Sequence, residues 1–381
     1  MSRKIMGYPL TEEFIYLTGV KKFGIMYCGG LFYKRRKDMK DHFNTVVGNK
    51  ALCRRLADDV ISSKLPHAII LEGPHGTGKH TISRLTAAAL SCENKSTSAA
   101  LPCLTCLSCR KALEHKSPDI IVVGREDKAT IGVDAVRFIK EDVSIVPNDS
   151  DNKVYIIEDA DKMTTQAQNA LLLTLEEPPA YVHFFLLCEN SGLLLETIRS
   201  RAPVLRTELL SREDIDNYIS STDRRAAQMK LSDPRTYREL LMASGYGIGR
   251  ALEFLDPKVF SPVMQMRTLA NDLITIAIRP TSAQNALQLL SRFPAKRDQL
   301  SQQLSMVTDA LRDLTVLKKS DDAPLCFYAD RERAMELSDE ASSGFLFKVY
   351  EALCETQDEI SQNANVKLCL TKLATKIGIL D

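Results

Sequence analysis

A glycine-rich segment has the residue types and the spacing to bind phosphate. Residues 73–81 read Gly-Pro-His-Gly-Thr-Gly-Lys-His-Thr, which fits the pattern G-x-x-x-x-G-K-[ST] except at its last position. Backbone N–H groups of such a loop surround anionic oxygens, and the lysine reaches the β and γ phosphates. The predicted nucleotide contacts in this segment are Gly73, Gly76, Thr77, Gly78, Lys79, His80 and Thr81.

The mismatch in this loop is His80, which stands where a hydroxyl residue normally binds Mg²⁺. Magnesium is a hard ion that prefers oxygen ligands, so an imidazole is a poor replacement. Thr81 cannot take over, because one step along a helix rotates the side chain by about 100°. We therefore expect that the loop can hold ATP but that its magnesium site is weak.

The flanking residues support a phosphate-binding loop. Residues 68–71 form a short apolar run typical of a buried strand, and residues 80–90 have apolar side chains at helical spacing. Strand, loop and helix are the context that such a loop requires, and the start of the helix adds a favourable dipole. The alternative is a glycine turn that binds no ligand.

A second candidate motif is an apolar strand that ends in two acids, Glu158 and Asp159. The usual ATPase order is Asp, which holds the metal shell, and then Glu, which aligns the attacking water. Here the order is reversed, and Asp159 is one methylene shorter than the usual base. A misplacement on the order of 1 Å can cost about 10²-fold in rate. Both motifs thus predict nucleotide binding with inefficient hydrolysis, unless the acids are ordinary solvated residues at a strand end.

Four cysteines lie in a short segment, residues 92–109, and could form a structural zinc site. Four thiolates suit a closed tetrahedral site, which leaves no position open for catalysis. The alternatives are a disulfide with spare cysteines, or inert core cysteines. The remaining six of the ten cysteines are scattered, which does not suggest a disulfide framework and favours a reducing compartment. The predicted zinc ligands are Cys92, Cys103, Cys106 and Cys109.

Further motifs resemble the bacterial clamp-loader ATPases of the DNA polymerase III holoenzyme. Residues 169–179 read Asn-Ala-Leu-Leu-Leu-Thr-Leu-Glu-Glu-Pro-Pro, an apolar strand follows at 182–187, and residues 197–201 read Thr-Ile-Arg-Ser-Arg. That family has a near-identical helix end, a strand and then a Ser-Arg-Cys motif, and it carries a four-cysteine zinc module after its phosphate-loop helix. The resemblance runs from about Phe43 to Asp256. Within the family, the altered nucleotide motifs are most similar to those of the delta-prime subunit.

The resemblance implies roles for four further residues. Arg201, with Ser200, matches the arginine that reaches into a neighbouring subunit's ATP site, although Ala202 replaces the usual cysteine. Such an arginine finger can contribute about 10³–10⁵ in rate. Asn190 stands near the family's first sensor position, and Arg250 resembles the second sensor. A surface arginine and a helix-start arginine are the plainer interpretations of Arg201 and Arg250.

The resemblance also implies a fold and an assembly. We expect an α/β AAA+ P-loop parallel sheet with strands near 119–123, 154–157 and 182–187, an inserted zinc module, a small helical lid and an all-α collar. We expect partners in a hetero-pentamer, namely gamma/tau and delta clamp-loader subunits, with the sliding clamp and primed DNA reached through the complex. The expected domains are 1–42, a basic leader that is disordered or a misassigned start; 43–209, the ATPase-like domain; 210–257, the lid; and 258–381, the collar.

Composition and periodicity are consistent with this organisation. Among 381 residues, 50 are Lys or Arg and 49 are Asp or Glu, so a net charge of +1 gives no electrostatic case for tight DNA binding by the chain alone. No apolar run suits a membrane span or a secretory signal, so we expect a cytoplasmic protein. Apolar residues between Leu300 and Leu317 recur at helical spacing, as a helical bundle requires.

Three functions are compatible with these observations. The first is a delta-prime-like subunit that gives Arg201 to a neighbour and hydrolyses little or no ATP itself. The second is an active gamma/tau-type ATPase, which the intact glycines and Lys79 favour. The third is a zinc-dependent nucleic-acid module, which the balanced charge disfavours.

Overall fold

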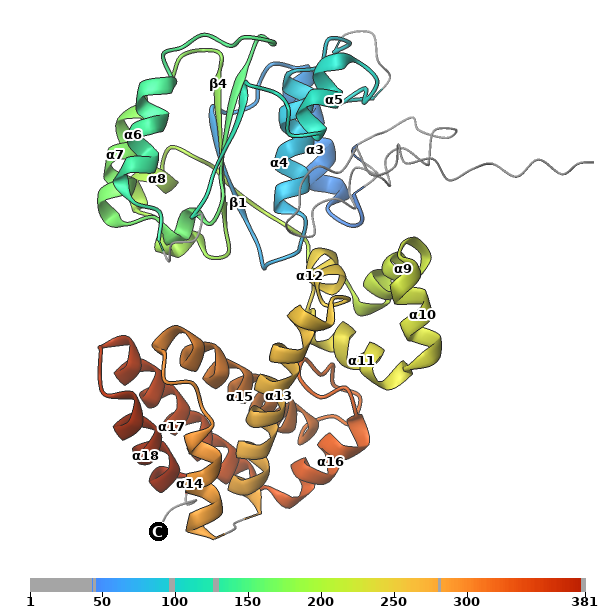
Figure 1. Ribbon diagram of the computed structural model, residues 1–381, viewed down its shortest axis with the longest axis vertical. Helices are drawn as coiled ribbons and strands as arrows, with labels where there is room; N and C mark the ends of the chain where they lie inside the picture. The colour runs from blue at the N-terminus through green and yellow to red at the C-terminus, as the bar shows by residue number, and fades with distance from the viewer. Residues whose placement is uncertain (1–42, 44–45, 96–99, 126–129, 280–281, 378–381) are drawn as a thin grey trace, which may run out of the picture. The chain divides into compact units, whose positions relative to one another are not determined.

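The chain folds into two compact units that divide after Leu210. The computed structural model describes residues 43, 46–95, 100–125, 130–279 and 282–377, and the basic leader expected at 1–42 lies outside them. Figure 1 shows an α/β unit followed by an all-helical unit. Among the described residues, no helix combines the length and the apolar character needed to cross a membrane.

The first unit is a five-stranded parallel sheet in the order β2-β3-β4-β1-β5. Helices α3, α4 and α5 lie on one side of the sheet, and α6, α7 and α8 lie on the other (Figure 1). The elements are α3 (Lys50–Ile61), β1 (Ala68–Glu72), α4 (Lys79–Leu90), α5 (Leu107–Leu113), β2 (Ile120–Val123), α6 (Val133–Asp142), β3 (Lys153–Ile157), η2 (Ala160–Lys162), α7 (Thr165–Glu176), β4 (Val182–Cys188), η3 (Ser191–Leu193), α8 (Glu196–Arg199) and β5 (Val204–Arg206).

The apolar strands divide their side chains between two cores. Ile69 and Leu71 of β1 pack in the core with α3 and α4, whereas Ile70 packs in the core with α6 and α7. Successive side chains of a strand point to opposite faces, so a strand covered on both faces needs an unbroken apolar run. This requirement explains why residues 68–71 read as a buried strand, and the predicted parallel α/β sheet is confirmed.

One strand was not predicted. β5 has only three residues and follows Pro203, so its sequence contains too few positions for a recognisable pattern. Its place in the sheet comes from pairing with β1, where Ile70 lies opposite Val204. Tertiary pairing, rather than local sequence, therefore defines this strand.

The second unit consists of helices. Its elements are α9 (Arg212–Thr222), α10 (Arg224–Ser232), α11 (Pro234–Ala243), α12 (Ile248–Glu253), α13 (Pro257–Ile278), α14 (Ala283–Ser291), α15 (Arg297–Leu317), α16 (Arg331–Glu340), α17 (Ser343–Ser361) and α18 (Val366–Lys376). The apolar residues noted between Leu300 and Leu317 lie on α15 and are buried in the largest core of this unit. The stripe at helical spacing is therefore the core-facing side of one long helix.

Candidate nucleotide site

The glycine-rich loop connects β1 to α4 and depends on glycine at three positions. Gly76 and Gly78 have φ angles of 81° and 94°, a region in which side chains are strained. At Gly73 a Cβ atom would lie 1.9 Å from Thr207 Oγ1. Thr207 follows β5, so packing against the edge of the sheet adds a constraint on Gly73 that the loop pattern does not show.

Lys79 is buried at the start of α4 and folds back over the loop. Its Nζ atom donates hydrogen bonds to the carbonyl oxygens of Gly73 and Pro74, the second at 2.8 Å. Burial lowers the pKa of Lys79, and the nearby carboxylates of Glu189, Asp161 and Asp159 act in the opposite direction. The ammonium group therefore lies inside the loop, among acids at the carboxyl ends of β3 and β4.

A buried asparagine that sequence reasoning missed holds the far side of the loop. Asn49 Nδ2 donates to the carbonyl oxygen of Thr77 at 3.2 Å, and Asn49 Oδ1 accepts from the backbone N–H of Glu208 at 2.7 Å. Thr77 Oγ1 in turn lies 2.8 Å from Thr207 Oγ1. Asn49 is fully buried with a φ of 53°, a left-handed conformation that asparagine tolerates better than most residues.

His80 and Glu158 are brought together by the fold. His80 is in the first turn of α4, Glu158 follows β3, and His80 Nδ1 lies 2.9 Å from Glu158 Oε1. In the sequence these residues are two separate departures from the ATPase pattern. In the structure their side chains contact each other. His80 stands where a hydroxyl residue is usual, and Glu158 stands where an aspartate is usual.

Asp159 also has a partner that was not predicted. Arg125, just after β2, donates from Nε to Asp159 Oδ2 at 2.8 Å. Asp159 has a φ of 50°, which turns the chain sharply after β3. The carboxylate expected to act as a weak base is therefore paired with a guanidinium group from the neighbouring strand.

Asn190 lies at the same end of the sheet as the loop. It follows β4, whose last residue Cys188 lies opposite Glu72 of β1 in the parallel ladder. Asn190 is the N-cap residue of η3, and its side chain accepts a hydrogen bond from the backbone N–H of Gly192 at 2.8 Å. Thr81 lies in the first turn of α4 and is half-buried.

Two other predicted residues lie in different surroundings. Arg201 follows α8, where its guanidinium group bonds to Glu176 and Thr197, which are not part of the phosphate loop. Arg250 belongs to the second unit, where its guanidinium carbon lies 5.4 Å from the ring centroid of Phe254. The phosphate loop, the acids after β3 and Asn190 are thus gathered at one edge of the sheet, whereas Arg201 has a separate set of contacts.

The four predicted zinc ligands do form a cluster. Their Sγ atoms all lie within 4.8 Å of one another, and Cys103 Sγ is 3.9 Å from Cys109 Sγ. A tetrahedral site with Zn–S bonds of about 2.3 Å places its sulfurs about 3.8 Å apart. Burial raises the pKa of Cys92 and Cys109 and acts in the same direction on Cys103, but hydrogen bonds from Thr105, Cys106 and Asn94 bring the pKa of Cys103 to about 6. The donor set therefore fits one structural zinc ion.

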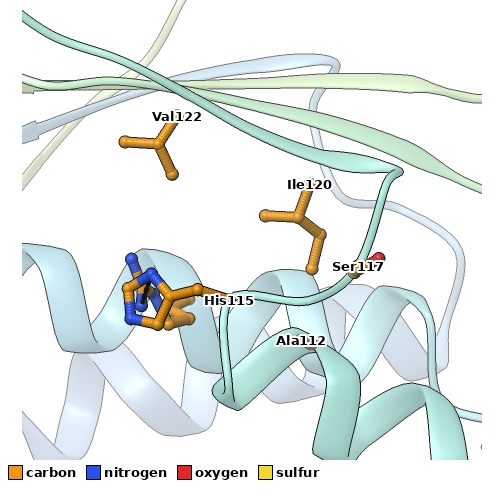
Figure 2. Close-up of a pocket in the computed structure, with 6 residues that line it drawn as sticks. Ala112, His115, Ser117, Ile120 and Val122 are labelled. Carbon is orange, nitrogen blue, oxygen red and sulfur yellow. Dashed lines mark hydrogen bonds between the residues drawn. The ribbon is translucent and has the colours of Figure 1, made fainter. Parts of the chain in front are cut away.

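A small cavity lies outside both the candidate nucleotide site and the cysteine cluster. It has a volume of about 240 Å³ and contains none of the predicted site residues. Figure 2 shows Ile120 and Val122 of β2 on one side and His115 on the other. Arg84 Nη1 donates to His115 Nδ1 at 2.6 Å, and the pKa of His115 is lowered by burial and by this guanidinium group. The cavity is lined by Arg84, Ala112, His115, Ser117, Ile120 and Val122.

Comparison with known proteins agrees with this geometry. Residues 48–210 match the protein family described as "DNA polymerase III, delta subunit". DNA polymerase III subunit gamma of Buchnera aphidicola subsp. Schizaphis graminum is 34% identical over 184 residues, which cover 48% of this chain and 50% of that protein. DNA polymerase III subunit tau of Escherichia coli is 31% identical over 227 residues, which cover 56% of this chain and 35% of that protein.

The chain therefore spans about half, or less, of the length of these curated relatives. Among solved structures, a gamma subunit-related protein of Thermotoga maritima is similar with a TM-score of 0.41 and 16% identity, over 85% of this chain and 98% of that one.

The order of the parallel strands and the loop between β1 and α4 define a P-loop protein of the AAA+ type. Over residues 48–210 the chain is similar to subunits of DNA polymerase III, in agreement with the clamp-loader resemblance of its sequence motifs.

Proposed function

We propose that this chain is a delta-prime-like subunit of a bacterial replicative clamp loader. It gives Arg201 to the ATP site of a neighbouring subunit and hydrolyses little or no ATP itself. Its partners are gamma/tau and delta subunits in a hetero-pentamer that loads the sliding clamp at primed DNA. The helices from α13 onward serve as the collar through which this chain joins the others.

The contact between His80 and Glu158 carries the proposal. In an active site of this type a hydroxyl and an aspartate hold Mg²⁺ and its water shell, and the metal neutralises charge on the phosphates. Here the two positions carry an imidazole and a longer carboxylate that bond to each other. A magnesium ion at Glu158 would have to share its carboxylate with this bond, and it would gain no oxygen ligand from His80.

The pairing of Asp159 with Arg125 supports the same conclusion. A base that aligns water must accept a proton or a hydrogen bond from it. The Arg125 guanidinium group already donates to one oxygen of Asp159, so that oxygen is less available to a water molecule. Nucleotide binding is compatible with this arrangement, because the loop glycines and Lys79 remain in place.

Reconstitution with purified partner subunits tests the proposal. In a complex whose other ATP sites are inactivated, Arg201→Ala should lower turnover at the adjacent site about 10³-fold. Arg199→Ala, which removes an exposed arginine two positions earlier, should leave turnover unchanged. The isolated chain should show negligible turnover with ATP and Mg²⁺. Unchanged turnover in the Arg201→Ala complex would overturn the proposal.

A second candidate is an active gamma/tau-type ATPase. It is favoured by the buried Lys79, by the intact glycines of the loop and by the names of the relatives, which are gamma and tau subunits. Robust ATP hydrolysis by the isolated chain, abolished by Lys79→Ala, would support this candidate against the first.

We also propose that the cysteine cluster holds a structural zinc ion. Cys92 follows α4, and Cys106 and Cys109 lie at the start of α5, so the metal ties the segment between these helices to the body of the unit. Because all four ligands come from the protein, the ion has no open position and no part in ATP chemistry.

A further inference from the structure

We propose that Glu176 is a positioning residue for Arg201: it holds the guanidinium group in a fixed direction before it meets the neighbour's phosphates. This inference rests on the proposed function of Arg201. It gives a role to the end of α7, the segment Leu-Glu-Glu-Pro-Pro, which no part of the nucleotide site uses.

Three hydrogen bonds within this chain hold the Arg201 side chain. Nη2 donates to Glu176 Oε1 at 2.7 Å, and Nη1 donates to the carbonyl oxygen of Thr197 at 3.0 Å and to Ser200 Oγ at 3.3 Å. Glu176 is the only one of these partners that carries charge and the only one outside the α8 region. It therefore fixes the side chain relative to the body of the unit rather than to its own loop.

The local sequence explains why a carboxylate stands at this point. Helix α7 ends at Glu176, and the residue before a proline disfavours helical geometry, so Pro178 prevents the helix from continuing. The carbonyl end of a helix is electronegative and attracts a cation. Helices α7 and α8 pack against each other in the same unit, which keeps Glu176 and Arg201 within reach (Figure 1).

The cis contacts leave part of the guanidinium group available. Arginine has five N–H donors, and three hydrogen bonds from Arg201 are formed with described residues. The remaining donors suit contact with phosphate oxygens, for which the planar guanidinium fork is well shaped. The side chain is 36% exposed, so it is accessible as well as held.

The exposure of this ion pair indicates that it contributes little to folding stability. Glu176 is 43% exposed, and pairs of this kind add little because solvent screens them. The expected benefit lies instead in ordering a long side chain, since freezing an arginine only at the moment of contact weakens the interaction. Ordering one long side chain in advance corresponds to about a two- to tenfold change in rate.

The test uses the reconstituted complex in which only the adjacent ATP site is active. Glu176→Ala should lower kcat about two- to tenfold without changing the KM for ATP. Glu176→Gln should restore a rate near that of the parent, because its amide oxygen still accepts from Nη2. Glu177→Ala, at the next exposed position, serves as the matched control and should have no effect.

A double variant separates positioning from general damage. In an Arg201→Ala background, Glu176→Ala should cause no further loss, because its whole effect passes through the arginine. A loss that persists in this background, or an unchanged or raised kcat for Glu176→Ala alone, overturns the inference.

A measurement on the isolated chain keeps the two proposals distinguishable. NMR relaxation of the Arg201 Nε–H group should show greater mobility in Glu176→Ala than in the parent or in Glu177→Ala. If mobility rises but Arg201→Ala does not slow the complex, the proposed function fails. If Arg201→Ala slows the complex but Glu176→Ala changes neither mobility nor kcat, only the positioning role fails.

Discussion

His80 Nδ1 lies 2.9 Å from Glu158 Oε1, so two of the residues that depart from the ATPase pattern are hydrogen-bonded to each other. Changing one without the other leaves an unmatched partner at the magnesium position. If Glu158 alone were aspartate, its shorter side chain would be too far from the His80 imidazole to keep this hydrogen bond. If His80 alone were threonine, the side chain of Glu158 would be one methylene too long for the usual metal site. The two departures therefore act as a pair.

The first prediction concerns magnesium. His80→Thr alone should not make ATP binding depend on Mg²⁺, whereas His80→Thr combined with Glu158→Asp should raise the affinity for ATP in the presence of Mg²⁺ about tenfold. Calorimetric titration with and without the metal measures this. Magnesium dependence in the single variant would show that Glu158 already serves as a metal ligand.

The parts of the site that could be predicted are those that short sequence patterns encode. The loop from Gly73 to Lys79 has its own spacing, and the buried strand before it has an unbroken apolar run. Asn49 and Glu208 are different, because they are 159 positions apart and meet only when β5 joins the sheet beside β1. No local pattern marks such a pair.

The same limit applies to the contacts of the charged residues. Arg125 and Asp159 come from neighbouring strands 34 positions apart, and Arg201 meets Glu176 across 25 positions. Sequence motifs identified Asp159 and Arg201 as candidate functional residues. The motifs could not indicate which charged group pairs with each residue, because the partner depends on which strand ends and helix ends the fold brings together.

The second prediction is that Asn49→Ala destabilises the first unit by about 3 kcal/mol. The substitution leaves the Thr77 carbonyl and the Glu208 N–H without their side-chain partner and places alanine at a φ of 53°. Urea unfolding followed by circular dichroism measures the change. Ser63→Ala is the matched control, since exposed Ser63 has a similar φ of 54° and should change by less than about 0.5 kcal/mol. Equal effects in the two variants would contradict a role for the buried hydrogen bonds.

The third prediction concerns Gly73. A Cβ atom at this position would lie 1.9 Å from Thr207 Oγ1, so Gly73→Ala should displace the loop and reduce ATP affinity at least about tenfold. Thr207→Ala removes the clashing oxygen, and the double variant should recover a large part of the affinity. Fluorescent-nucleotide titration of the three variants tests this. No recovery in the double variant would place the cost in the loop backbone rather than in the contact with Thr207.

The fourth prediction concerns the cysteine cluster, in which Cys92 and Cys109 lie close together at the two ends of the segment 92–109. Elemental analysis of the reduced protein should find about one zinc per chain, and Cys109→Ser should lower that ratio, whereas Cys53→Ser, a buried cysteine outside the cluster, should not. A disulfide that closes a loop of similar length stabilises the folded state by about 3 kcal/mol, and we expect the metal to contribute a similar amount. Removing it with a chelator under reducing conditions should therefore lower the melting temperature of the first unit by about 6–12 °C. Because the ion binds away from the phosphate loop, ATP affinity measured below the melting transition should stay the same. A parallel loss of ATP affinity would show that the zinc segment supports the loop directly.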